Sequence, residues 1–144
     1  MKFKSQYHFK GEIAKIQPYF SDLKVYGKLH PLIRTVKELK TQDASVSLFE
    51  VSERPFGWVP IQVRYQALVK KHKNLIGFQI KKLPFTKLNF NYEFIEITEK
   101  EFEIKFRVYM KSRMIGSRLF FKKMITAQNQ LMNNVLLEIY QSEK

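Results

Sequence analysis

Apolar and polar residues alternate along much of the chain. The clearest example is segment 101–111, in which every second residue from Phe102 to Met110 is apolar and the residues between them are mostly charged. Because successive side chains of a strand point to opposite faces, this period of two predicts a half-buried β-strand. The pattern recurs often enough to predict seven strands, over 3–13, 32–40, 45–54, 58–70, 75–82, 87–98 and 101–111.

Two further features describe the sheet that these strands form. In 87–98 the apolar positions run in steps of two from Leu88 to Phe94 and then shift by one residue to Ile95 and Ile97, which predicts a β-bulge. The connections between the last six strands are all short enough for hairpins, so an antiparallel meander is the simplest topology.

The pattern becomes helical after Gly116-Ser117. Apolar residues then follow three-and-four spacing from Phe121 to Ile139, with no glycine or proline between them. A helix over 117–142 is about 38 Å long. So long a helix must lie across much of the sheet to cover its apolar stripe.

A shorter helical stretch over 15–29 follows the first strand. Pro18 interrupts it, and Ser21-Asp22 is a suitable cap for a second helix. The His30-Pro31 step ends the stretch, because a residue before proline avoids the helical region. We therefore predict two short helices between the first and second strands.

Composition limits the class of protein and the kinds of site. A chain of 144 residues fits one domain, which we expect over 1–144, and its 15% aromatic content favours a large core or an apolar pocket. Cysteine is absent and the three histidines are scattered, so we expect no metal site and no cofactor. Charges interrupt the N-terminal residues, and no apolar run approaches the roughly 20 residues that span a bilayer, so we expect a cytoplasmic protein.

The order of elements, a strand, two short helices, a six-strand meander and a long helix, resembles that of the helix-grip superfamily. This superfamily includes START-like (SRPBCC) lipid-binding domains and polyketide cyclase/dehydrase-like proteins. The local resemblance lies in Tyr19-Phe20-Ser21-Asp22-Leu23 and in His30-Pro31-Leu32-Ile33, which look like the two-helix segment and its step into the second strand. The resemblance implies an α+β helix-grip fold, with a curved seven-stranded antiparallel sheet wrapped around the C-terminal helix. It also implies a cavity for hydrophobic molecules between the two.

Large apolar residues collect in the connections at one end of the predicted sheet. Successive turns of a meander alternate between its ends, and the turns near 41–44, 70–74 and 98–101 are polar, as surface turns should be. Exposed apolar clusters at the other end mark a contact surface or a groove. We expect a cavity mouth there, unless these residues fold inward and close the core; they are Phe56, Trp58, Phe85 and Met114, beside Ile115.

Residues on the inner face of the strands and on the helix stripe are candidates for lining the cavity, with plain core packing as the alternative. Gln128 is the most informative, because a buried amide needs a hydrogen-bond partner. The candidates are Tyr65, Tyr92, Phe94, Phe106, Met110, Met124, Gln128 and Met132.

The chain carries 26 Lys and Arg against 13 Asp and Glu, a formal net charge of +13. Such an excess attracts polyanions. The apolar end also carries cations, which suits an anionic membrane surface or a ligand with an acidic head, whereas the alternative is a solvated basic surface. These cations are Arg54, Lys81, Lys82, Lys87, Lys111, Arg113 and Arg118.

The leading hypothesis is a module that binds a hydrophobic or lipid-like small molecule, with transport of that molecule as an additional role and no catalytic residues assigned. The alternative is a cyclase/dehydratase-like enzyme, which needs polar groups such as Tyr65, Tyr92, Glu50 or His30 inside the cavity. We expect a local structural role for His30. A third hypothesis is a basic factor that associates with membranes or ribosomes. RNA is the less favoured partner, because the strands lack an exposed aromatic stacking platform.

Overall fold

The structure, a computed structural model, describes residues 1–43, 45–56 and 60–142. It contains seven strands and a long C-terminal helix, with short helices between the first two strands, as predicted. The elements are β1 (Lys2–Lys10), α1 (Ile13–Ile16), α2 (Pro18–Ser21), α3 (Leu23–Leu29), β2 (Ile33–Asp43), β3 (Val46–Glu53), β4 (Val63–His72), β5 (Leu75–Lys81), β6 (Thr86–Thr98), β7 (Glu101–Ser112) and α4 (Ser117–Ser142).

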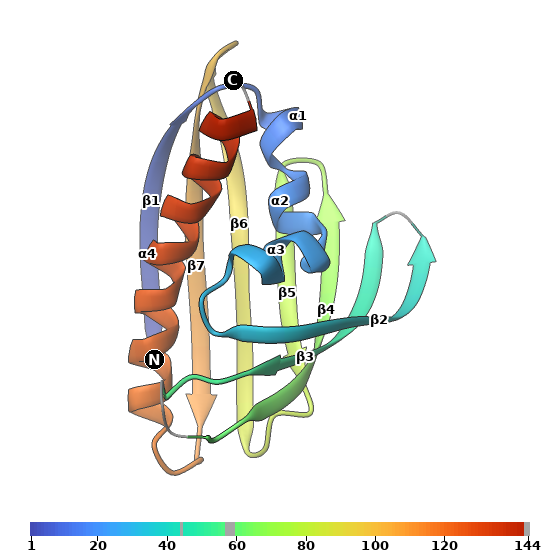
Figure 1. The fold of residues 1–144 in the computed structure, drawn as a ribbon, viewed down its shortest axis with the longest axis vertical. Helices are drawn as coiled ribbons and strands as arrows, with labels where there is room; N and C mark the ends of the chain where they lie inside the picture. The colour runs from blue at the N-terminus through green and yellow to red at the C-terminus, as the bar shows by residue number, and fades with distance from the viewer. Residues whose placement is uncertain (44, 57–59, 143–144) are drawn as a thin grey trace.

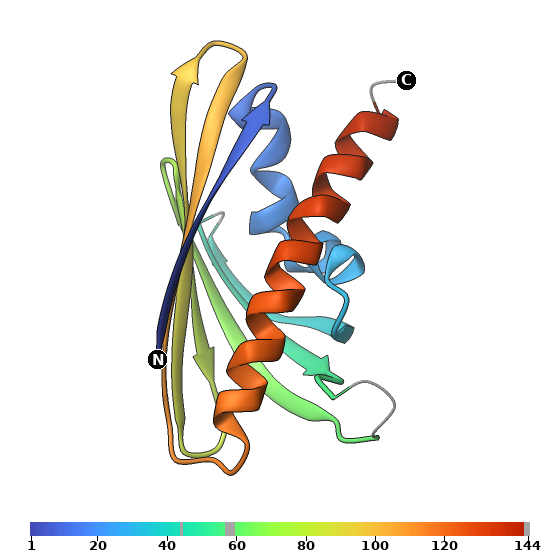
Figure 2. The same ribbon diagram turned by 90° about the vertical axis from the view of Figure 1, so that its left-hand side faces the viewer.

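The strands form one antiparallel sheet in the order β1-β7-β6-β5-β4-β3-β2. Strands β2 to β7 are the predicted meander, and β1 pairs with β7 along its whole length, from Lys2 opposite Tyr109 to Lys10 opposite Glu101. The sheet bends, so that β2 and β3 swing around toward α4 (Figures 1 and 2). Helices α1 to α4 lie on its concave face (Figure 2).

The predicted helical segment between β1 and β2 is present, but it is divided into three short helices, where the sequence indicated two. α1 and α2 run on almost continuously through Gln17, which has helical dihedral angles, and Pro18 occupies the first turn of α2. Asp22 caps α3 as predicted, because its carboxylate accepts a hydrogen bond from the Lys24 amide at 3.1 Å. The segment between β1 and β2 is thus a broken helix followed by α3.

The structure corrects the start of one predicted strand and moves the position of the predicted bulge. β4 begins at Val63 and not at residue 58: Pro60 has no backbone N–H to donate, and Ile61 is exposed outside the strand. Residues 57–59 lie outside the described part of the chain. In β6 the predicted irregularity is present, but the register shift falls between Glu96 and Thr98, slightly later than the apolar pattern indicated.

Helix α4 turns its apolar stripe to the sheet and is tied to its surroundings by polar contacts. The buried residues of this helix include Gln128, Leu131 and Val135. Asn134 donates to the carbonyl of Leu29 at 2.7 Å, and Asn129 accepts from the hydroxyl of Tyr7 at 2.7 Å. None of the described helices has both the length and the apolarity needed to cross a membrane.

Aromatic rings fill the space between α4, α3 and the sheet. Tyr92, on β6, lies at the centre, with ring centroids 4.7 Å from Phe20 and 5.1 Å from Phe106. Tyr26 on α3 stands 5.5 Å from Phe78. Large flat side chains are needed here because the curved sheet holds its centre away from the helix.

Gly27 allows α3 to approach β2 closely. A Cβ atom at this position stands 2.7 Å from Cγ2 of Val36 and 3.2 Å from Cγ2 of Ile33. Alanine is the better helix former by about 1 kcal/mol, yet we predict that Gly27→Ala lowers the free energy of unfolding by about 1–2 kcal/mol, because β-branched methyl groups cannot move aside. Urea unfolding measures this change.

A double-mutant cycle with Val36→Ala isolates the clash. The second substitution removes the nearer methyl group, so the loss caused by Gly27→Ala should shrink in that background. Gly77→Ala is the matched control, because its nearest neighbour is a backbone oxygen at 4.0 Å. Equal losses at Gly27 and Gly77 contradict the close-approach argument.

Candidate functional site

A small pocket, the inner pocket, lies between the sheet and α4. Its volume is about 30 Å³. That is far too small for an organic ligand, because pockets for small ligands are typically about 300–1,000 Å³. In this conformation the protein's own side chains fill the expected cavity. The pocket is lined by Tyr26, His30, Ile33, Glu53, Tyr65, Ile80, Leu88, Phe90, Phe106, Met124 and Gln128.

A chain of buried hydrogen bonds joins α3, the sheet and α4 beside this pocket. The Tyr92 hydroxyl donates to Oε1 of Gln128 at 2.6 Å and lies 2.8 Å from the hydroxyl of Tyr26. Because the single Tyr92 proton goes to Gln128, Tyr26 must be the donor to Tyr92. Burial raises the pKa of both tyrosines, so both hydroxyls stay protonated and the direction of the chain is fixed.

The amide of Gln128 is satisfied on one side only. Its oxygen accepts from Tyr92, but its buried nitrogen has no hydrogen-bond partner among the described residues. An unpaired buried donor costs about 1–3 kcal/mol. Gln128 lines the pocket, so this N–H₂ group is available to an acceptor inside it.

Glu53 is the only buried carboxylate in the described chain and forms the second polar element of the pocket. It ends β3 and accepts a hydrogen bond from Tyr65 on the neighbouring strand β4. Burial raises the pKa of Glu53 to about 7, although the hydrogen bond from Tyr65 opposes the shift. This group therefore exchanges a proton near neutral pH.

His30 is buried at the end of α3. Its Nδ1 accepts a hydrogen bond from the backbone N–H of Leu32 at 3.2 Å, so the proton of the neutral ring sits on Nε2. Burial lowers the pKa of His30 to about 4. This hydrogen bond closes the turn before β2, which is the local structural role predicted for the residue.

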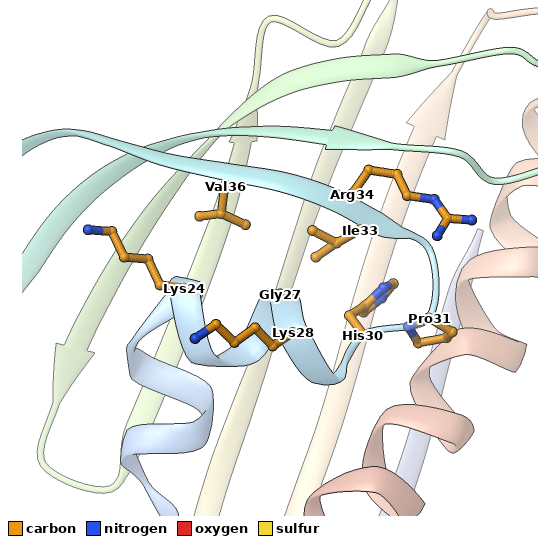
Figure 3. A pocket seen from close by; sticks show the side chains of 8 residues that line it. All are labelled: Lys24, Gly27, Lys28, His30, Pro31, Ile33, Arg34 and Val36. Atoms are coloured by element: carbon orange, nitrogen blue, oxygen red, sulfur yellow. The ribbon is translucent and has the colours of Figure 1, made fainter.

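A larger hollow, the outer groove, lies on the other side of His30 between α3 and β2 (Figure 3). Its volume is about 630 Å³, within the range of small-ligand sites. His30 and Ile33 line both this groove and the inner pocket, so they form the partition between them. Lys24, Lys28 and Arg34 give the groove a basic lining.

The structure brings part of the predicted lining together. Tyr65, Phe106, Met124 and Gln128 line the inner pocket, and Tyr92 is bonded to Gln128 behind its wall. Phe94, Met110 and Met132 are buried in the core without lining the pocket.

The residues predicted to frame a mouth are more dispersed. Phe56 is half-buried and packs against the core, Met114 is half-buried, and Phe85 is exposed. Trp58 lies outside the described residues. None of the three described residues lines the inner pocket, and their role stays a prediction.

Sequence reasoning missed several residues of the pocket, chiefly Glu53 and Tyr26. The sequence does not show which face of the strand Glu53 lies on, because Val51, Ser52 and Glu53 are all buried at the end of β3 and no alternation marks them. Glu50, its alternative as a polar candidate, is exposed. Tyr26 carried a signal, since its helical spacing placed it on the inner side of the short helix, but a phenol there did not by itself indicate a site.

No protein-family model matches the chain, and no curated protein matches it. Among solved structures, the Zhui aromatase/cyclase of a Streptomyces species is similar at TM-score 0.82 and 9% identity, over 100% of this chain and 96% of that chain. A START superfamily protein of Mycobacterium smegmatis is similar at TM-score 0.76 and 13% identity, over 97% of each chain.

Norcoclaurine synthase of Thalictrum flavum, solved in complex with dopamine and hydroxybenzaldehyde, is similar at TM-score 0.70 and 11% identity, over 100% of this chain and 88% of that chain. At such low identities the agreement concerns the course of the backbone. Together with the curved sheet, the short helices and α4, it shows that this chain has the helix-grip fold of START-like proteins.

Proposed function

We propose that residues 1–144 act as a single domain that binds a hydrophobic small molecule carrying a polar group, in the space between the sheet and α4. The observation that carries this proposal is the set of polar groups around the inner pocket, above all the unpartnered Gln128 amide nitrogen. A core built for stability alone has no use for an orphaned donor beside a buried carboxyl group. A ligand with a hydroxyl or carbonyl oxygen satisfies that donor.

Binding requires the pocket to open, and two of its walls suit that change. Met124 and Phe90 are both half-buried, and methionine is flexible enough to repack around variable contents. His30 and Ile33 separate the pocket from the outer groove, where Lys28 and Arg34, together with Lys24, which pairs with Glu38 at 3.9 Å, favour an acidic head. The cytoplasm is the proposed location.

The similar structures support this class of ligand. One is an aromatase/cyclase and another was solved with dopamine and hydroxybenzaldehyde, which are small aromatic molecules with polar substituents. A pocket walled by Phe90, Phe106 and Tyr65 offers rings of the same kind.

The pocket is tested by blocking it from α4. Met124→Trp places an indole in the inner pocket, so we predict that the affinity for anilinonaphthalene sulfonate, an apolar probe with an acidic group, falls about tenfold or more. Fluorescence titration measures the affinity, and native mass spectrometry of freshly purified protein looks for a bound small molecule.

Leu136→Trp is the control, because it adds the same ring to an exposed position of the same helix. Its affinity should stay within about twofold of the unmodified protein. Equal losses in both variants, or an unmodified protein that binds no probe and carries no molecule, contradict the proposed site.

A second candidate function, a general acid–base enzyme on the same class of substrate, is favoured by Glu53. A carboxyl group with a pKa near 7 can both donate and accept a proton at neutral pH, and Tyr65 orients it toward the pocket wall. The available chemistry is proton transfer during a cyclisation or dehydration of a largely apolar substrate that carries a polar group.

The ionisation of Glu53 predicts how stability depends on pH. Its pKa is about 7 when folded against 4.5 ordinarily, so the folded state binds the extra proton between these values and the free energy of unfolding falls as pH rises. Glu53→Gln removes this pH-dependent loss of stability, because glutamine does not ionise, and it keeps an oxygen that can accept the hydrogen bond from Tyr65. Relative to the unmodified protein, the variant should gain about 3 kcal/mol between pH 4.5 and 7, measured by urea unfolding.

His30 should make the free energy of unfolding change with pH in the opposite direction, which checks the result for Glu53. Its pKa is about 4 when folded against 6.5 ordinarily, so the unfolded state binds more protons in that range and stability rises with pH. His30→Asn keeps an acceptor for Leu32 but should lose about 3 kcal/mol relative to the unmodified protein from pH 4 to 6.5. If the difference in free energy of unfolding between each variant and the unmodified protein does not change with pH, the assigned ionisation states of Glu53 and His30 are wrong.

A further inference from the structure

The end of the molecule at the bottom of Figures 1 and 2 carries the two most exposed large apolar side chains among the described residues. Ile115, in the β7–α4 connection, is 99% exposed, and Phe85, in the β5–β6 turn, is 80% exposed. Ile61 and Leu119 are also exposed at this end. We call residues 82–85 and 113–116 the loop tips. Such side chains at protruding turns indicate a contact surface.

The loop tips are held together by short-range hydrogen bonds. The backbone N–H of Arg113 donates to the carbonyl of Phe85 at 3.0 Å, and the Thr86 and Ser112 hydroxyls lie 2.6 Å apart. The Ser112 hydroxyl also accepts from the N–H of Met114 at 3.0 Å. The two connections that carry Phe85 and Ile115 are therefore fixed side by side, which lowers the ordering cost of binding.

The backbone of Phe85 is a second indication of a contact surface, because its φ is 54°. A bulky aromatic residue in the left-handed region is strained, and such strain persists where the surrounding structure imposes it, often at functional sites. The strain is not offset by burial of the ring, since the ring is exposed. Packing of this protein alone does not account for a phenylalanine at this position.

Cations surround the loop tips, and acidic residues are absent from them. The segments from Arg54 to Tyr92 and from Ile104 to Leu137 contain no aspartate or glutamate. The β6–β7 turn, at the top of Figure 1, carries a cluster of glutamates instead. Six exposed cations lie around the tips, none in an ion pair with a described residue: Lys81, Lys82, Lys87, Lys111, Arg113 and Arg118.

We propose that the loop tips dock this protein on an anionic membrane surface. Phe85 and Ile115 enter the boundary between headgroups and acyl chains, while the surrounding lysines and arginines contact lipid phosphates and keep their alkyl stems along the apolar layer. Charge and apolar area act together here, because neither alone gives firm attachment. In this orientation the loop tips face the membrane and the β6–β7 turn, at the opposite end of the molecule, points away from it. This surface does not depend on the proposed ligand pocket.

An RNA partner fits these observations less well. RNA phosphates need the cations but leave the exposed aliphatic Ile115 without a partner, and single-stranded bases stack on several aromatic rings. The loop tips offer one ring, that of Phe85. RNA binding is therefore an outcome of the test that counts against the proposal.

The test is sedimentation of the full chain with vesicles of phosphatidylcholine alone or with about one-third phosphatidylserine. We expect binding to the anionic vesicles about tenfold or more tighter than to neutral ones, and weaker in high salt. Phe85→Asn combined with Ile115→Ser removes the apolar tips, and asparagine tolerates the left-handed conformation at 85. This pair should weaken binding about tenfold.

Leu75→Ser combined with Lys73→Gln is the control, since it removes an exposed leucine at the start of β5 and a cation from the β4–β5 turn, at the opposite end of the sheet from the loop tips (Figure 1). Its binding should be unchanged, and thermal unfolding checks that every variant folds. Absence of binding to anionic vesicles overturns the proposal. So does retained binding by the apolar-tip variant, or RNA binding that is stronger than vesicle binding and does not respond to that variant.

Discussion

The hydroxyl group of Tyr92 connects the three parts of this structure. Tyr92 stands on β6, receives a hydrogen bond from Tyr26 on α3 and donates one to Gln128 on α4, while its ring packs against Phe20 and Phe106. A curved sheet cannot press its centre against a straight helix, so long side chains must bridge the space. Tyrosine bridges it with a polar end, which then needs a partner in the interior. The hydrogen-bonded chain from Tyr26 through Tyr92 to Gln128 is thus a consequence of how this sheet reaches its helix.

The sequence predicted the framework because the framework depends on periodicity. Segment 101–111 has one buried face along almost all of β7, and the stripe of 117–142 became the buried side of α4. The pocket depends on other information. Glu53 sits where both faces of β3 are covered, so no alternation marks it. The volume left between Phe90 and Met124 depends on side-chain conformations across elements distant in sequence, and periodicity contains nothing about them.

In this protein the fold and the side chains of the site give different information about function. The helix-grip fold is shared with an aromatase/cyclase at 9% identity and a norcoclaurine synthase at 11% identity, so the backbone does not choose among functions. The choice rests with a few side chains: a carboxyl group near neutrality, an amide with a free donor, and a partition one residue thick between an enclosed pocket and a basic groove. These lie on β3, α4 and the turn after α3, which are separate elements brought together by the curvature of the sheet.

The pairing of β1 with β7 has a consequence for how the chain folds. The amino group of Met1 reaches the carbonyl of Met110, a separation of 109 residues, and β1 has no other strand beside it. During synthesis β1 must therefore wait, unpaired, until β7 has emerged, while the hairpins from β2 onward can form as they appear. Contacts of such long range slow folding. The charged residues that alternate along β1, such as Lys4 and Lys10, discourage the waiting strand from pairing with other chains.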